Sequence, residues 1–151
     1  MKNLLLIVLT FLGCTKNNNS ASMKEMIEIV PLSPYSYTFI TGGRTNRIDY
    51  YTVQNPPSEV KALYRQLEKE ISARYTQVED YKFLSIYIYK ETSELNEKFI
   101  GSKKSFDGRN NDLVAFIRFV NNKKDIFYIL KNSKVIYDGV EDQKLNFEFD
   151  E

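Results

Sequence analysis

Acid–base chemistry in this chain depends on carboxylates, because the sequence contains no histidine and a single cysteine. The absence of histidine excludes a Ser-His-Asp or Cys-His catalytic set, and together with the single cysteine it excludes histidine- or thiolate-rich zinc sites. A hydrolase would need two carboxylates held across a cleft, with the pKa of at least one of them raised. The candidates are Asp49, Glu79, Asp80, Asp107, Asp112 and Asp138. They lie near turns or predicted strand ends, where acidic residues are common, so we expect no enzyme, no metal site and no cofactor.

Two arginines follow a glycine turn in the segment 42–47, which reads Gly-Gly-Arg-Thr-Asn-Arg. Arg44 and Arg47 could grip a carboxylate or a phosphate group through bidentate hydrogen bonds. The segment is not a phosphate loop, because the required lysine is absent and a strand rather than a helix is predicted to follow. The alternative is a solvated hairpin tip without a ligand.

The segment 101–111 is a polar loop with one large apolar residue, Phe106. Loops often carry function, so Phe106 and Arg109 are predicted contact residues of a binding loop. The alternative is an ordinary connection in which Phe106 folds back into the core.

Tyrosines are frequent, with eleven in the chain, and nine of them lie on or beside predicted strands. These nine are Tyr35, Tyr37, Tyr50, Tyr51, Tyr81, Tyr87, Tyr89, Tyr128 and Tyr137. If several share the sheet face away from the helix, they form an aromatic platform suited to protein or sugar contacts. We predict Tyr87 and Tyr89 as binding residues on this platform. The alternative is a set of half-buried core and rim residues.

One helix and a series of strands must position these side chains. Apolar residues at Val60, Leu63, Tyr64, Leu67 and Ile71 predict a helix from Ser58 to about Tyr75, capped by Asn55 or Ser58. A shorter helix is expected from Thr92 or Ser93 to Phe99.

The predicted strands follow runs of alternating or continuous apolar residues. Six of them cover residues 35–40, 46–53, 82–90, 112–120, 125–131 and 134–138. A short leading strand within 23–32 and a last edge strand near 145–149 are further candidates. We therefore expect an α+β fold: a mostly antiparallel sheet of about five or six strands with one long amphipathic helix packed on one face.

The N-terminus has the pattern of a secretory signal. Lys2 precedes an apolar run from Leu4 to Leu12, and Gly13 supplies a small residue before Cys14. A nine-residue run spans roughly 14 Å as a helix, about half of a bilayer's hydrocarbon core. The block Phe11-Leu12-Gly13-Cys14 resembles the lipobox of bacterial lipoproteins. The resemblance implies cleavage before Cys14 and lipidation of its sulfur, whereas the alternative is an ordinary signal peptide with an incidental cysteine.

This interpretation divides the chain into a signal peptide (1–13), a lipidated Cys14 with a flexible tether (14–23) and a single α+β domain (24–151). In lipoproteins the residues after the cysteine influence sorting. Thr15 is not the aspartate associated with inner-membrane retention, so the resemblance implies the outer membrane, facing the periplasm.

The charges almost balance, with 21 basic and 20 acidic residues in the full chain. No nucleic-acid partner is therefore expected. The leading hypothesis is a non-enzymatic, lipid-anchored binding module of the cell envelope, whose partner is another envelope protein. The alternatives are a lipid-anchored inhibitor or immunity-type protein and, third, a carboxylate hydrolase.

Overall fold

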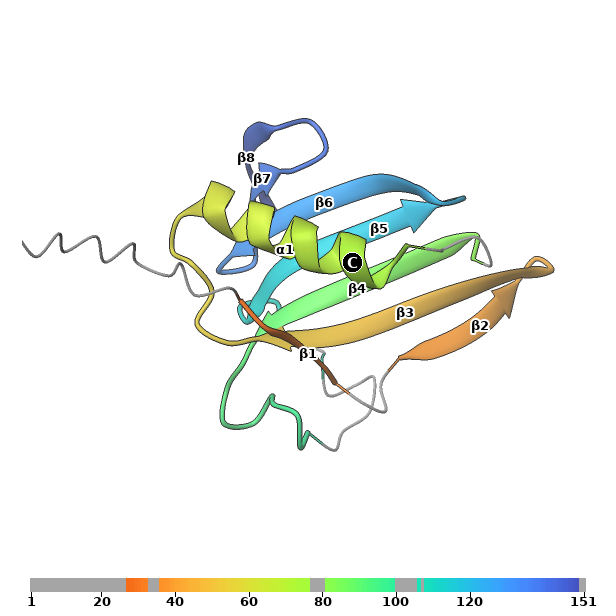
Figure 1. The fold of residues 1–151 in the computed structure, drawn as a ribbon, viewed down its shortest axis with the longest axis horizontal. Coiled ribbons are helices and arrows are strands. Elements are labelled where there is room, and N and C mark those ends of the chain that lie inside the picture. The colour runs from red at the N-terminus through yellow and green to blue at the C-terminus, as the bar shows by residue number, and fades with distance from the viewer. Residues whose placement is uncertain (1–26, 33–35, 77–80, 100–105, 107, 150–151) are drawn as a thin grey trace, which may run out of the picture.

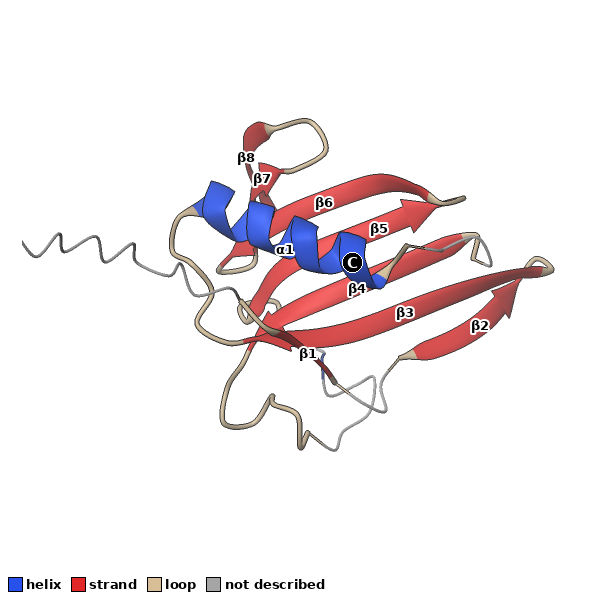
Figure 2. Ribbon diagram, viewed as in Figure 1, coloured by secondary structure: helices blue, strands red, loops and turns tan. Residues whose placement is uncertain are grey.

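The computed structural model describes residues 27–32, 36–76, 81–99, 106 and 108–149. Within this part of the chain, eight strands form one twisted sheet and one helix lies across a face of it (Figure 1). The predicted α+β class is confirmed, although sheet predominates and the number of strands is larger than the five or six expected (Figure 2).

The elements follow in a simple order along the chain. They are β1 (Ile29–Pro31), β2 (Tyr37–Thr41), β3 (Arg44–Val53), α1 (Val60–Arg74), β4 (Phe83–Lys90), β5 (Leu113–Val120), β6 (Lys123–Lys131), β7 (Lys134–Asp138) and β8 (Gln143–Glu148).

The sheet is antiparallel except between β3 and β4, which are parallel and joined through α1. Two short strands share the free edge of β3: β2 pairs with its first half and β1 with its last three residues. Pro31 lies in β1. Proline cannot donate a backbone hydrogen bond, and an edge strand tolerates this better than a central strand does. On the other side, β4 to β8 follow one another in chain order.

Three hairpins are closed by two-residue turns in which both central residues have positive φ. The turns are Gly42-Gly43, Asn121-Asn122 and Asn132-Ser133. Such turns match the right-handed twist of the flanking strands, and glycine and asparagine tolerate the conformation best. The predicted turn over 121–124 is therefore too long, since β6 already begins at Lys123.

Helix α1 buries the side of the helix that the apolar spacing predicted. Its most buried residues are Ala62, Leu63, Leu67 and Ile71. The helix begins after Glu59, whose carboxylate accepts hydrogen bonds from the N–H groups of Lys61 and Ala62 at 3.0 and 2.7 Å. The predicted caps, Asn55 and Ser58, are thus wrong, because Glu59 fills the same role.

Apolar side chains are buried on both faces of the sheet. On the α1 face, Leu84, Ile86 and Ile88 of β4 pack under Leu67 and Ile71. On the opposite face, Leu95 and Phe106 from the connection between β4 and β5 cover part of the sheet. The short helix predicted up to Phe99 is wrong: the residues from Ser93 to Lys98 form bends and turns.

Candidate binding site

Five aromatic rings form a continuous row across the sheet on the face opposite α1. The aromatic row consists of Tyr37, Tyr50, Tyr87, Phe116 and Phe149, with successive ring centroids 6.5, 5.3, 4.9 and 5.2 Å apart. The sheet register explains the row, because Tyr87 lies directly beside Tyr50 on one side and Phe116 on the other. Direct neighbours in a sheet point to the same face.

Much of the aromatic row is covered. The ring of Phe106 stacks on Tyr50 at a centroid distance of 4.3 Å and lies 5.3 Å from Tyr89, so Tyr50 and Tyr89 are buried. Phe116 and Phe149 are buried as well, whereas Tyr37 and Tyr87 are half-buried. These rings are therefore buried or half-buried, as the alternative interpretation expected, and they do not form an open platform.

The exposed aromatic surface lies at the two ends of the face. Phe39 on β2 is 40% exposed and Phe147 on β8 is 44% exposed. Of the other predicted platform residues, Tyr128 shares this face, Tyr51, Tyr81 and Tyr137 pack on the α1 side, and Tyr35 lies outside the described residues.

Strand β2 is an edge without charged residues. Its sequence is Tyr-Thr-Phe-Ile-Thr, and among the described strands it pairs only with β3. Ile40 is 74% exposed, the highest value among the large apolar residues described. Natural proteins usually protect such an edge with lysine, proline or a covering segment.

A pocket of about 330 Å³ lies beside β2 on the aromatic face. Phe39 and Phe83 provide apolar walls, and Asn46, Ser85 and Arg118 provide polar groups. Asn46 is 3% exposed, and its Nδ2 donates to the carbonyl oxygen of Arg44 at 3.2 Å. Its Oδ1 has no hydrogen-bond partner in the described structure and needs a donor.

Arg44 and Arg47 do not meet at the turn. Arg44 is exposed at the hairpin tip, whereas Arg47 lies on the α1 side. There its Nε donates to both carboxylate oxygens of Asp49 at 2.8 and 3.0 Å, and its Nη1 donates to the hydroxyl of Tyr81. Arg47 is therefore committed to an internal partner. The two side chains are separated because the residues are three apart in a strand, where odd separations point to opposite faces.

Asp49 is the centre of a buried polar cluster under the C-terminal end of α1. Besides its ion pair with Arg47, it accepts a hydrogen bond from the hydroxyl of Tyr75 at 2.6 Å, and Tyr75 shares another of 2.6 Å with the hydroxyl of Tyr51. Burial raises the pKa of Tyr75 well above its ordinary value, and the hydrogen bond to Asp49 adds to this rise. Burial likewise raises the pKa of Tyr51.

The other carboxylate candidates also have structural partners. Arg109, a predicted contact residue, donates to Glu94 at 2.9 Å and lies 3.8 Å from Asp112. Asp138 accepts hydrogen bonds from the backbone N–H groups of Val140 and Glu141, and these bonds stabilise the turn before β8. Three further carboxylate candidates lie outside the described residues: Glu79, Asp80 and Asp107. The predicted lipidation site, Cys14, lies outside them as well. The described candidates thus serve as ion-pair partners or turn caps.

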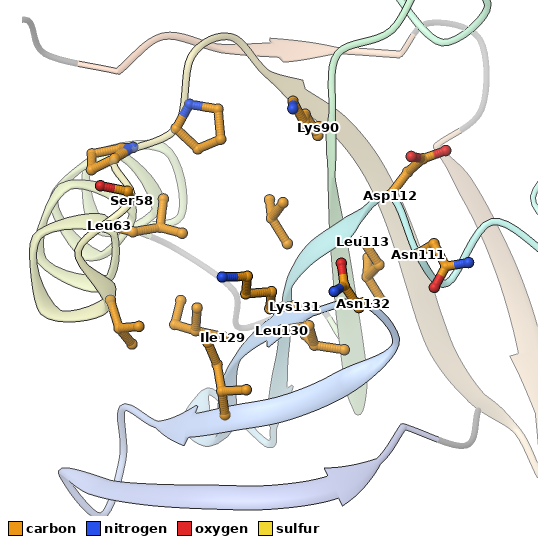
Figure 3. Close-up of a pocket in the computed structure, with 15 residues that line it drawn as sticks. Ser58, Leu63, Lys90, Asn111, Asp112, Leu113, Ile129, Leu130, Lys131 and Asn132 are labelled. Atoms are coloured by element: carbon orange, nitrogen blue, oxygen red, sulfur yellow. The ribbon is translucent and has the colours of Figure 1, made fainter.

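The structure also contains a cavity that no sequence motif indicated. It holds about 490 Å³ and lies between the N-terminal end of α1 and the strands β5, β6 and β7 (Figure 3). Its apolar lining includes Leu63, Leu113 and Ile129, and its polar lining includes Lys90 and Lys131. These residues come from separate segments of the chain, so no local sequence pattern could indicate the cavity.

The described residues contain no cluster of three or more His, Cys, Asp or Glu side chains placed to hold a metal ion. No helix in the described part of the chain is long and apolar enough to span a membrane.

Comparison with protein families, curated proteins and solved structures gave no match, so function must be inferred from geometry.

Proposed function

We propose that this protein is a lipid-anchored, non-enzymatic binding module of the bacterial cell envelope, and that it binds an extended segment of another envelope protein at β2. The observation that carries the contact is the uncharged, exposed edge strand β2 beside the aromatic face. The anchor is supported by the sequence pattern that ends at Cys14.

Strand addition accounts for three features of this edge together. They are the unpaired outer backbone of β2, the pocket beside Phe39, and Asn46 Oδ1, which has no partner in the described structure. The outer backbone groups of β2 are available to an incoming strand, since β2 pairs only with β3 among the described strands. Main-chain hydrogen bonds provide affinity in such complexes, and pockets for alternate side chains provide specificity. The pocket beside Phe39 suits an apolar side chain with an N–H or O–H group, which could donate to Asn46 Oδ1.

A photo-crosslinking amino acid at position 40 tests the contact surface. We expect a specific adduct with one envelope protein when the probe replaces Ile40, and none when it replaces Lys69, an exposed residue of α1. Ile40→Lys should reduce capture of the same partner, because a charge on an edge strand opposes strand pairing. Equal adducts from both positions would contradict the proposal. A partner whose own toxic or hydrolytic activity is blocked would identify the inhibitor alternative.

Metabolic labelling with a palmitate analogue tests the anchor separately. The wild-type protein should incorporate label and fractionate with membranes, and Cys14→Ser should lose both properties. Release of unlabelled wild-type protein would show that Cys14 is incidental.

A further inference from the structure

The cavity at the N-terminal end of α1 is separate from the β2 edge. Pro56, Pro57 and Val60 line it from the side of the helix, and Val114 and Ile136 line it from the strands. Its volume of about 490 Å³ falls within the range of small-molecule sites, about 300–1,000 Å³. The prolines give this wall a fixed backbone, which favours a preformed site.

The interior of the cavity is aliphatic. Leu63, Leu113 and Ile129 are almost completely buried behind it, while Val60 and Val114 are half-buried. Such a lining favours the hydrocarbon part of a ligand through the removal of apolar surface from water.

The rim carries two lysines that have no ion-pair partner among the described residues. Figure 3 shows Lys131 extending from β6 toward α1 across the opening, with Lys90 at its margin. Neither lysine forms an ion pair in the described structure, whereas Lys61 and Lys124 are paired with Asp142 and Glu68.

One neighbouring carboxylate reduces this positive charge in part. Asp112 also lines the cavity, but its carboxylate lies 3.8 Å from Arg109 and is thereby partly compensated. The first N–H groups of α1 are occupied by Glu59, so an anion would be recognised by the lysines and not by the helix end.

We infer that this cavity binds a free fatty acid, with its chain on the aliphatic lining and its carboxylate between Lys90 and Lys131. Charge complementarity selects the head group, because ammonium groups without ion-pair partners face an opening whose interior is apolar. The inference does not depend on strand addition at β2, because the two sites share no lining residue.

Calorimetric titration with dodecanoate, below its micellar concentration, tests the site on the purified full chain carrying Cys14→Ser. Dodecanol serves as the matched uncharged ligand. We expect saturable binding of one dodecanoate and at least tenfold weaker binding of dodecanol. Lys131→Met should weaken dodecanoate binding roughly fivefold, because hydrogen bonds to charged groups are stronger than neutral ones.

Two further variants separate the site from general surface effects. Lys144→Met removes an exposed lysine from β8 and should leave binding unchanged. Val114→Phe should occupy the cavity and abolish binding while the far-ultraviolet circular dichroism stays native. The inference is overturned if dodecanoate does not bind, if dodecanol binds equally well, or if Lys144→Met and Lys131→Met act alike.

Discussion

Removal of the Asp49 carboxylate should destabilise the fold by about 3 kcal/mol. Asp49 is completely buried and accepts hydrogen bonds from Arg47 and Tyr75. Breaking a buried pair by removing one partner costs about 3–5 kcal/mol, since it leaves the other group uncompensated. We place Asp49→Ala at the lower end because the Arg47 side chain is 36% exposed and can recruit water.

Urea unfolding followed by tyrosine fluorescence measures this cost, and the chain has no tryptophan to obscure the signal. Asp49→Asn should cost about 1–2 kcal/mol, because the amide oxygen still accepts from Tyr75 while the charge is lost. The double variant with Arg47→Met should show a coupling energy of at least about 1 kcal/mol, as expected for residues in one network.

Asp125→Ala is the matched control for this prediction. Asp125 pairs with Arg118, but both side chains are about two-fifths exposed, at 43% and 39%. Exposed pairs contribute about 0–1 kcal/mol, so this variant should stay near wild-type stability. If Asp49→Ala costs no more than Asp125→Ala, the buried cluster does not stabilise the fold as argued.

Three other perturbations test the packing. Phe106→Ala should cost about 3 kcal/mol and increase hydrogen exchange in the described residues 91–99 and 108–112, because the ring is buried against the sheet; unchanged exchange would contradict this. Stability should fall as pH rises above about 10, because unfolded tyrosines ionise there. Folded Tyr75 and Tyr137 do not, since burial raises both pKa values, that of Tyr137 to about 12; a free energy of unfolding that stays constant as the pH rises through about 10 to about 12 would refute the argument. Gly139→Ala should cost about 1–3 kcal/mol, because its Cβ would lie 2.3 Å from the ring of Tyr64; an unchanged urea midpoint would show that the ring moves freely.

The helix and the hairpins could be predicted because their signals are local. The spacing of Val60, Leu63 and Leu67 has the helical period, and the paired residues with positive φ are glycines, asparagines and a serine. The pairing of the first strand could not be predicted in this way. In the described part of the predicted strand 23–32 only three residues form β1, and its pairing depends on the edge that β3 leaves free beyond β2.

The site was harder to predict because burial depends on distant segments. The alternation along β4 placed Tyr87 and Tyr89 on one face, as the sequence indicated. Whether those rings are exposed depends on Phe106, which lies in a segment without periodicity. The exposed aromatic surface instead includes Phe39, whose edge position follows only from the sheet topology.

The order of the strands has a consequence for folding. From β5 to β8 each strand pairs with its neighbour in the chain, and two of the three connections are two-residue turns. Such local contacts form quickly, whereas the β3–β4 pair must first close a chain that includes α1. Strand β1 joins through three residue pairs to the far end of β3. The first strand of the sheet to be synthesised is therefore expected among the last to gain protection, and pulse-labelled hydrogen exchange during refolding would reveal this order.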